Sequence, residues 1–568
     1  MRLKGAEIVV ECLIENGTDI IFGYPGGAVI PIYDALYDRK DRIKHILTSH
    51  EQGAAHAADG YARVKKKTGV CIATSGPGAT NLVTGIATAY MDSTPMVAIT
   101  GNVSTDLIGK DSFQEVDILG ITMPITKHNY QVTKAEDIAR TIREAFIIAE
   151  TGRPGPVLVD ITKDALMNEC EFEESLPEER IKELRAVVGI DKCNPKIVKE
   201  ITESVEYAVK LIEESKKPAI YAGGGVITSG AKEELLEFAE KIQAPVSCSL
   251  MGISGFPCDH ELYAGMVGMH GSKTSNMAFT ECDLLVVLGA RFSDRVTGKA
   301  NLFARGAKVL HIDIDSAEVN KNISAYHHVI DDVKCVLKEF NKRLTKQDHK
   351  EWLDKISNWK KEDKALLEGR HMPREIISGL RDLFDEDAVI VTDVGQHQMW
   401  TAQYYKFRKR DIFVTSGGLG TMGFGLGATI GSQFGSKGQR VILITGDGSF
   451  RMNMNEMLTA AKYNLPIIVI LMDNNALGMV RQWQDLFYDR RFSETTLPEV
   501  KFDEIAKAIG FDTYRIDKSE EFEGVFKQAL KSQKPVLIQC KIDHDTMVLP
   551  MVPPGKAIDN ILMKKAQI

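Results

Sequence analysis

Short apolar runs that alternate with helical segments dominate the pattern of hydrophobic and polar positions along this chain. The clearest case is an apolar run at 441–445 that ends in the glycine turn GDGSF (446–450), continues into a helical segment and reaches a second apolar run at 466–472. The same order of strand, glycine turn, helix, proline and strand occurs at 69–101. Because parallel strands need a crossover helix between them, each copy predicts a βαβ unit.

The two βαβ units have nearly equal spacing and lie toward opposite ends of the chain. Gly76 precedes Pro95 by 19 positions, and Gly446 precedes Pro466 by 20. Such spacing is common in α/β proteins, but the placement of the copies in the first and last thirds favours two related domains on either side of another. We therefore expect an α/β protein of three doubly wound, parallel-sheet domains.

Polar stretches set the middle third apart from both ends. The charged stretch at 171–185 predicts a linker, and the polar stretch at 342–364 predicts a helical connector. The expected division is a first domain at 1–170, a middle domain at 190–342, a third domain at 368–548 and a C-terminal tail at 549–568.

Three apolar runs of the middle third, at 218–226, 283–292 and 308–315, each end in glycine or an acid. Ligands of open parallel sheets bind beyond the carboxyl ends of the strands, where glycine admits a phosphate and an acid can accept ribose hydroxyls. The pattern favours a nucleotide-binding domain, although a structural glycine turn explains any single run about equally well.

Composition narrows the class of protein. The 568 residues are 44% hydrophobic, enough for several cores, and the formal net charge of −8 provides no positive field for nucleic acid or an anionic membrane. Nine cysteines without a C-x-x-C pair favour reduced thiols over a disulfide framework. The chain starts without a signal-like apolar stretch, and no run approaches the roughly 20 apolar residues of a membrane helix. We expect a cytoplasmic protein with no nucleic-acid or membrane partner.

The turn GDGSF places a bare carboxylate, Asp447, between two glycines at the end of a buried strand. From Gly448 to Asn474 there are 25 intervening residues, a length that in a βαβ unit brings both strand ends to one edge of the sheet. A carboxylate and an amide oxygen, with backbone carbonyls nearby, suit Mg²⁺. Gly446 and Gly448 would let a phosphate reach the N–H groups of the next helix. The alternative is an ordinary turn, which Asp and Asn both favour.

GDG followed by about two dozen residues and NN resembles the signature of thiamin diphosphate enzymes. In that family one domain copy binds the diphosphate and the other binds the aminopyrimidine. The first copy here carries SGPG where the third carries TGDG, so it lacks the metal-binding acid. The family's glutamate that bonds the pyrimidine ring nitrogen corresponds to Glu51, which follows the apolar run at 43–48. Without the resemblance, Glu51 would be interpreted as an acid stabilised by a helix N-terminus.

Further motifs resemble the biosynthetic catalytic subunit of the acetohydroxyacid synthase family, also called acetolactate synthase, over nearly the whole chain. They are IFGYPGGAVIPIYDAL (21–36), DSFQEVDILGIT (111–122), GRPGPVLVDITKD (152–164), VGQHQMW (394–400), TSGGLGTMGFGLGA (415–428), LGMVRQWQ (477–484) and MVPPGKAI (551–558). The resemblance implies a transferase that decarboxylates pyruvate on thiamin diphosphate. It joins the hydroxyethyl unit to a second pyruvate or to 2-ketobutyrate, the first common step of valine, leucine and isoleucine biosynthesis.

The resemblance also implies the residues that hold thiamin diphosphate and its metal ion. The Mg²⁺ ligands would be Asp447, Asn474 and the backbone carbonyl of Ala476. The thiamin diphosphate contacts would be Glu51, Gly395, Gln396, His397, Gly420, Met422, Gly446, Asp447, Gly448, Ser449, Asn474, Ala476, Gly478 and Met479. Among them Met422 would bend the cofactor and Gly420 would accept from its amine. Taken alone, Met422 would more safely be interpreted as a core methionine.

Catalytic and flavin-binding residues follow from the same resemblance. The catalytic set would be Glu51, Phe113, Gln114, Arg295 and Trp483, with Phe113 and Gln114 reaching the cofactor of the neighbouring subunit. The middle domain would bind FAD that performs no net redox. Its expected contacts are Arg153, Gly223, Gly224, Gly268, His270, Gly289, Arg291, Arg295, Asp313 and Asp332. Ser293, in RFSDR, departs from the acid that the pattern usually has, and this puts one flavin contact in question.

Because Glu51 and Asp447 belong to different domains, the resemblance implies an active site formed between two chains. The implied assembly is a homodimer or homotetramer. A separate small regulatory subunit is also implied. Three alternatives stay open. A 2-keto acid decarboxylase or pyruvate oxidase would share Glu51 and the metal pair but lack RFSDRVTG together with VRQWQ. A catabolic acetolactate synthase would dispense with FAD. A catalytically silent nucleotide-binding scaffold or regulatory subunit would have no reason to keep Glu51, Asp447 and Asn474 together.

Overall fold

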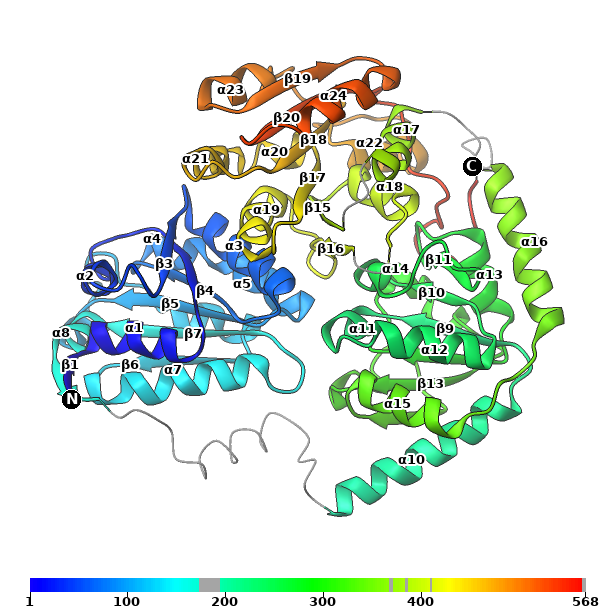
Figure 1. Cartoon of the computed structure of the whole chain (residues 1–568), viewed down its shortest axis with the longest axis horizontal. Helices are drawn as coiled ribbons and strands as arrows, with labels where there is room; N and C mark the ends of the chain where they lie inside the picture. Colours follow the sequence, from blue (N-terminus) through cyan, green and yellow to red (C-terminus); the bar gives the residue numbers. More distant parts are fainter. Residues whose placement is uncertain (173–194, 367–370, 384–386, 409–410, 564–568) are drawn as a thin grey trace.

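Three parallel six-stranded sheets, each covered by helices, form the body of the protein (Figure 1). The computed structural model describes residues 1–172, 195–366, 371–383, 387–408 and 411–563. The predicted linker at 171–185 therefore lies almost wholly outside the described residues. The prediction of three parallel-sheet α/β domains is confirmed, while the boundaries expected for them stay predictions.

The first sheet has the order β3-β2-β4-β5-β7-β6. Its strands are β2 (Ile20–Gly23), β3 (Lys44–Leu47), β4 (Gly69–Ala73), β5 (Met96–Asn102), β6 (His128–Val132) and β7 (Pro156–Thr162), and β1 (Arg2–Lys4) pairs antiparallel with β8 (Glu169–Glu171). The helices are α1 (Gly5–Glu15), α2 (Ile30–Tyr37), α3 (Glu51–Lys65), α4 (Pro77–Asn81), α5 (Val83–Asp92), η1 (Thr105–Leu107), α6 (Ile118–Thr122), η2 (Met123–Ile125), α7 (Ala135–Glu150) and α8 (Lys163–Met167).

The third sheet repeats this arrangement, with the order β16-β15-β17-β18-β20-β19. Its strands are β15 (Ala388–Thr392), β16 (Ile412–Val414), β17 (Arg440–Gly446), β18 (Ile468–Asp473), β19 (Asp512–Ile516) and β20 (Val536–Lys541). The helices are α17 (Met372–Leu380), η6 (Arg381–Leu383), α18 (Gln396–Tyr404), α19 (Phe424–Gly435), α20 (Asp447–Phe450), η7 (Met454–Glu456), α21 (Met457–Lys462), α22 (Gly478–Phe487), α23 (Phe502–Ile509), η8 (Ser519–Glu521) and α24 (Phe522–Ala529). Counted within each domain, both sheets read 2-1-3-4-6-5, so the predicted repeat is confirmed.

The middle sheet reads 3-2-1-4-5-6 when counted in the same way, the order of dinucleotide-binding domains. Its strands are β9 (Pro218–Ala222), β10 (Val246–Cys248), β11 (Tyr263–Met266), β12 (Leu284–Leu288), β13 (Lys308–Asp313) and β14 (His327–Ile330). The helices are α10 (Pro195–Glu214), α11 (Gly224–Thr228), α12 (Lys232–Ile242), η3 (Leu250–Gly255), α13 (Lys273–Glu281), α14 (Asp294–Thr297), η4 (Ala300–Leu302), η5 (Ser316–Glu318), α15 (Val333–Arg343) and α16 (Lys350–Leu366).

Helices α3 and α19 join the first domain to the third through glycine (Figure 1). A β-carbon at Gly60 would lie 2.1 Å from the carbonyl oxygen of Ala428, and one at Gly431 would lie 1.8 Å from that of Ala57. Neither position has room for a side chain, so the two helix backbones can approach closely because both residues are glycine.

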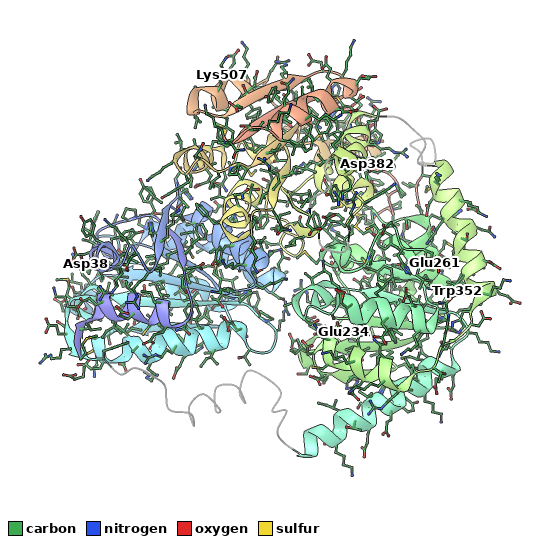
Figure 2. The ribbon with its side chains drawn as sticks, in the orientation of Figure 1. Asp38, Glu234, Glu261, Trp352, Asp382 and Lys507 are labelled. Carbon is green, nitrogen blue, oxygen red and sulfur yellow. The ribbon has the colours of Figure 1, made fainter. Side chains whose placement is uncertain are left out.

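Most of the predicted connector at 342–364 forms α16. This helix packs against the middle domain and does not only link two domains. Trp352 and Trp359 are both buried against the middle domain, and Trp352 (Figure 2) donates its indole N–H to the carbonyl of Pro218 at 3.0 Å. The two tryptophans make α16 part of the middle domain's core.

The described part of the C-terminal tail returns from the third domain to the middle domain. The N–H of Val552 donates to Met269 O at 2.7 Å, the N–H of Lys299 donates to Lys556 O at 3.0 Å, and Asn276 Nδ2 donates to Ile558 O at 2.9 Å. Within the described ranges, the helices are too short or too polar to cross a membrane.

Candidate active site

The carboxyl ends of β17 and β18 bring Asp447, Asn474 and Ala476 together, as the spacing predicts. The strands pair in parallel with Gly446 opposite Met472, and the backbone N–H of Asn474 donates to the Asp447 carboxylate. A β-carbon at Gly448 would lie 3.8 Å from the carbonyl oxygen of Ala476. The three expected metal ligands therefore surround one turn.

The burial and the raised pKa of Asp447 are typical of a carboxylate that binds a cation. Its side chain is buried, and its Oδ2 atom has no hydrogen-bond partner among the described residues. Burial raises the pKa of Asp447 to about 7, and the nearby Asp473 carboxylate adds to the increase. A divalent ion would offset both effects, so the oxygen donors present fit Mg²⁺.

Glycines at the starts of helices α18, α20 and α22 form a cradle beside Asp447. A β-carbon at Gly446 would lie 2.8 Å from His397 Nδ1, and one at Gly478 would lie 2.1 Å from Gln396 Oε1. Ser449 Oγ donates to the carbonyl of Val394 at 2.6 Å, next to the α18 N-cap. Helix N-termini present free N–H groups, so this cradle suits a diphosphate.

His397 and Gln396 complete the cradle with side chains. His397 Nε2 is buried without a hydrogen-bond partner among the described residues. Burial lowers the pKa of His397 to about 3, so the ring is neutral at pH 7 and can donate one N–H without carrying charge. Gln396 is held by Gln482 and by the carbonyl of Thr546, both at 2.9 Å.

Glu51 lies in the first domain, as the first residue of α3. It is 9% exposed and accepts a hydrogen bond from Asn81 Nδ2 at 3.0 Å. A β-carbon at Gly76 would lie 2.8 Å from the carbonyl oxygen of Gln114, so Gln114 packs on the SGPG turn. Phe113 is 87% exposed. The first-domain candidates thus gather around one turn.

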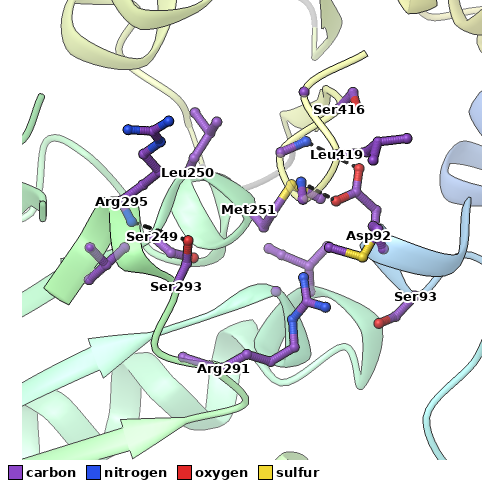
Figure 3. A pocket seen from close by; sticks show the side chains of 18 of the residues that line it. Asp92, Ser93, Ser249, Leu250, Met251, Arg291, Ser293, Arg295, Ser416 and Leu419 are labelled. Atoms are coloured by element: carbon purple, nitrogen blue, oxygen red, sulfur yellow. Dashed lines mark hydrogen bonds between the residues drawn. The ribbon is translucent and has the colours of Figure 1, made fainter. Parts of the chain in front are cut away.

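A cavity of ≈ 2160 Å³ lies where the three domains meet (Figure 3). It exceeds the roughly 300–1,000 Å³ of a typical small-ligand pocket. Of the expected flavin contacts it is lined by Arg153, Gly224, His270, Gly289, Arg291, Arg295, Asp313 and Asp332, and of the thiamin and catalytic sets by Gly395, Gly420, Met479 and Trp483.

Other predicted residues lie outside this cavity. Gly223 packs behind its wall, since a β-carbon there would lie 2.1 Å from Gly289 O, and Gly268, with φ of +112°, lies against the carbonyl of Arg295. Met422 is half-buried two residues beyond Gly420. Glu51, Phe113 and Gln114 are not among the described residues that line the cavity. Within one chain, the catalytic candidates therefore form separate groups.

The arginines that line the cavity include Arg153, Arg291 and Arg295. Arg153 of the first domain bonds Glu318 at 2.9 Å and Asp315 at 3.3 Å in the middle domain. Burial lowers the pKa of Arg291, and the charge of Arg153 adds to the decrease. Arg295 has a side chain that is 64% exposed at the cavity. These groups could meet phosphate or carboxylate oxygens.

The acids and Ser293 are partly engaged with the backbone. Asp332 caps α15 by accepting from Lys334 N at 2.9 Å and from Cys335 N, and Asp313 accepts from Asp315 N at 3.0 Å. Ser293 caps α14 by accepting from Arg295 N at 3.3 Å (Figure 3). Its hydroxyl keeps the cap that a carboxylate would make but brings no negative charge.

Asp92 and Met251 also line the cavity, beside the 416–420 segment, and neither was predicted from the sequence. Asp92 accepts from the N–H of Gly418 at 2.7 Å (Figure 3). Its signal in the sequence is weak, since an acid that ends a helix shortly before a proline is ordinary.

Comparison with known families identifies the class. Three family models match consecutive parts of the chain: "Thiamine pyrophosphate enzyme, N-terminal TPP binding domain" over residues 3–121, the "central domain" of these enzymes over 205–340, and their "C-terminal TPP binding domain" over 393–540. The chain therefore carries all three domains of a thiamine pyrophosphate enzyme.

Similar proteins narrow the class. A probable acetolactate synthase large subunit of Methanocaldococcus jannaschii is 48% identical, over 99% of this chain and 95% of the relative. The acetolactate synthase isozyme 2 large subunit of Escherichia coli K12 is 43% identical, over 99% and 100%. The acetolactate synthase large subunit of Cyanidium caldarium is 43% identical, over 98% and 96%. The chain belongs to the acetolactate synthase large-subunit family, and the resemblance seen in its motifs is confirmed.

Proposed function

We propose that this chain is the catalytic subunit of a thiamin diphosphate-dependent acetolactate synthase of branched-chain amino acid biosynthesis. It would decarboxylate pyruvate and transfer the two-carbon unit to a second pyruvate or to 2-ketobutyrate. The proposal rests mainly on the buried Asp447 oxygen, which has no hydrogen-bond partner among the described residues and lies inside a cradle of helix N-termini, in a chain that matches this family over nearly its whole length.

In this proposal the third domain holds the metal and the diphosphate. Asp447, Asn474 and the Ala476 carbonyl would bind Mg²⁺. The N–H groups at the starts of α18, α20 and α22 would donate hydrogen bonds to the phosphate oxygens. His397, as a neutral imidazole, would donate one N–H to the diphosphate. Bound thiamin diphosphate supplies the nucleophile for the 2-keto acid.

Glu51 would hold a proton at the pyrimidine end of the cofactor. Its hydrogen bond from Asn81 and its burial keep the carboxyl group in one orientation. Because Glu51 lies in the first domain and Asp447 in the third, we propose that the complete site forms between two chains. Phe113, which is 87% exposed in the single chain, would then be covered by the partner.

The three-domain cavity would hold FAD and the path to the reacting centre. The dinucleotide-type strand order of the middle domain, the volume of ≈ 2160 Å³ and the arginines support this assignment. Trp483 would line the pocket of the second keto acid, and Arg295 would reach the substrate carboxylate or FAD. We also propose a cytoplasmic location. The relatives are named large subunits, which implies a small partner subunit.

The deciding experiment measures acetolactate formed from pyruvate, with and without 2-ketobutyrate, in enzyme stripped of cofactors and given thiamin diphosphate, Mg²⁺ and FAD in turn. We expect activity when all three are present and a mixed product when 2-ketobutyrate is added. Absence of both acetolactate formation and Mg²⁺-dependent thiamin diphosphate binding would contradict the proposal. Full activity without FAD would instead indicate a flavin-independent acetolactate synthase.

A further inference from the structure

Asp92 lies at the point where the three domains meet in the cavity. It ends α5 of the first domain, and its side chain is fully buried. Its carboxylate accepts from the N–H groups of Gly417 at 3.1 Å and Gly418 at 2.7 Å in the third domain (Figure 3). Met251 of the middle domain presses on the same segment, since a β-carbon at Gly417 would lie 2.4 Å from its sulfur.

A buried arginine fixes the orientation of Asp92. Arg63 Nη2 donates to Asp92 Oδ2 at 3.1 Å and to Asp59 Oδ2 at 3.1 Å. Its Nη1 donates to the carbonyl of Thr415 at 2.8 Å. These hydrogen bonds hold the Asp92 carboxylate in one orientation. Removal of either charged partner would be disruptive, because the other charge would stay buried and unpaired.

Residues 415–423, called the glycine loop below, are tied to α5 at two points. Besides the Asp92 contact, Thr88 of α5 shares a hydrogen bond of 2.7 Å with the hydroxyl of Thr421. The N–H of Thr421 donates to Ser416 Oγ at 3.0 Å and closes the loop. Glycine has little conformational preference of its own, so these contacts decide the shape of the loop.

The glycine loop borders both cofactor regions. Residues 416–420 line the large cavity, whereas Gly420 and Met422 belong to the set expected to contact thiamin diphosphate. Past Met422, the N–H of Gly423 donates to Asp393 Oδ1 at 2.8 Å, at the end of β15 in the diphosphate-binding domain. A ligand in either region would therefore contact the same short segment.

We propose that Asp92 is a positioning residue that couples the two cofactor sites. By anchoring the glycine loop between them, it makes a dinucleotide in the cavity strengthen thiamin diphosphate binding, and the reverse. The inference rests on the proposed function, since it needs both cofactors. Because the anchored loop is held as one unit, a shift that either ligand imposes on it changes the contacts it offers to the other ligand.

The test is an equilibrium binding measurement. The dissociation constant of thiamin diphosphate, in excess Mg²⁺, is measured by calorimetry on cofactor-free protein with and without saturating FAD. We expect FAD to lower it by roughly fivefold or more, the lower end of typical coupling. The reciprocal titration of FAD, with and without thiamin diphosphate and Mg²⁺, must give the same factor because coupling is mutual.

Two variants break the anchor from opposite sides. Asp92→Asn keeps the shape but replaces one acceptor oxygen with an amide and removes the charge that faces Arg63. Gly418→Ala adds a β-carbon 2.8 Å from Asp92 Oδ1 and from the carbonyl of Met91, which pushes the loop away. We expect the coupling factor to fall below about twofold in both, even if the separate affinities also change.

Asp363→Asn is the matched control. Asp363 is a buried carboxylate that also accepts from two successive N–H groups, those of Lys273 at 3.0 Å and Thr274 at 2.8 Å, and it is not among the described residues that line the cavity. This variant should keep the wild-type factor.

The outcomes separate this inference from the proposed function. Wild-type protein that binds neither cofactor contradicts the proposed function and this inference with it. Binding of both with no coupling, or with coupling that Asp92→Asn retains, overturns the role of Asp92 alone. If circular dichroism shows that Asp92→Asn is unfolded, the factor measured in Gly418→Ala decides.

Discussion

The first and third domains share one strand order, yet they place different residues at the same turn. After its third strand the first domain begins α4 with Pro77, and the third domain begins α20 with Asp447. Proline suits the first position of a helix because the missing N–H is not needed there. Aspartate at that position brings a carboxylate with one oxygen that has no hydrogen-bond partner in the described part of the chain. One residue at a shared helix start thus separates the copy that we propose to bind Mg²⁺ from a copy that has no carboxylate at that position.

The segments after the fourth strands differ in a similar way. The segment after β5 carries Phe113, which is 87% exposed. The segment after β18 folds into α22, where Trp483 packs edge to face on Phe487 with ring centroids 5.6 Å apart. Trp483 is thus packed within its own domain, whereas Phe113 is exposed in the single chain and would be covered only in the proposed dimer.

The two copies also support each other. Glu456, in the crossover that joins Asp447 to Asn474, accepts from the N–H of Ser49 at 3.1 Å, and Tyr463 OH accepts from Leu47 N at 2.8 Å. The βαβ unit that carries Asp447 therefore holds the strand end that leads into α3 and its catalytic candidate, Glu51.

The largest effect is expected from Asp447→Asn, which makes the third copy resemble the first. Loss of the charged ligand should weaken Mg²⁺-dependent thiamin diphosphate binding by more than about 100-fold, beyond the cost of losing an outer-shell partner. Calorimetric titration measures the loss. Asp160→Asn, a buried carboxylate of the first copy, should leave the Mg²⁺ dependence unchanged, and an unaltered affinity in Asp447→Asn would remove Asp447 from the metal site.

Glu51→Gln is expected to have the next largest effect. The amide can still accept from Asn81, so the fold and thiamin diphosphate affinity should persist, while kcat falls by about 10²–10⁴ because proton transfer is lost. Steady-state assays and binding titrations measure the two quantities. Glu7→Gln exchanges another first-turn helix glutamate of the same domain and should leave kcat intact. Full turnover in Glu51→Gln would refute its role.

Glu456→Ala tests the joint between the copies. The change leaves the N–H groups of Ser49 and His50 without their acceptor, and each unsatisfied group costs about 1–3 kcal/mol. We expect the free energy of unfolding, from urea titration, to fall by about 2–4 kcal/mol. Glu521→Ala removes an exposed glutamate that accepts from two successive N–H groups and should cost less than about 1 kcal/mol. Equal losses in both variants would dismiss the joint.

The smallest effect is expected from Trp483→Leu. A wider pocket should weaken the preference for 2-ketobutyrate and shift the product ratio by about tenfold toward acetolactate, the scale of one hydrophobic contact. A competition assay with both keto acids reports the ratio. Trp359→Leu makes the same exchange in α16 and should not change it. A constant ratio in Trp483→Leu would place the second substrate elsewhere.

Separation along the sequence explains which contacts could be predicted from the sequence. Asp447 and Asn474 meet because one βαβ crossover joins them, so a local pattern was sufficient. Asp92 could not be found in this way, since its partner Gly418 is 326 positions away and neither residue is unusual in its own segment. Similarly, the polar pattern of 342–364 predicted a helix but concealed the packing of Trp352 and Trp359, because two large side chains can complete a core among many lysines.

The returning C-terminal tail has a consequence for how the protein is made. Asn276 waits for the carbonyl of Ile558, 282 positions later, to complete its buried hydrogen bonds. The middle domain emerges from the ribosome long before that carbonyl exists. Its final packing is therefore postponed until translation ends. In a truncated product, the Asn276 side chain would keep an unsatisfied N–H group inside the middle domain.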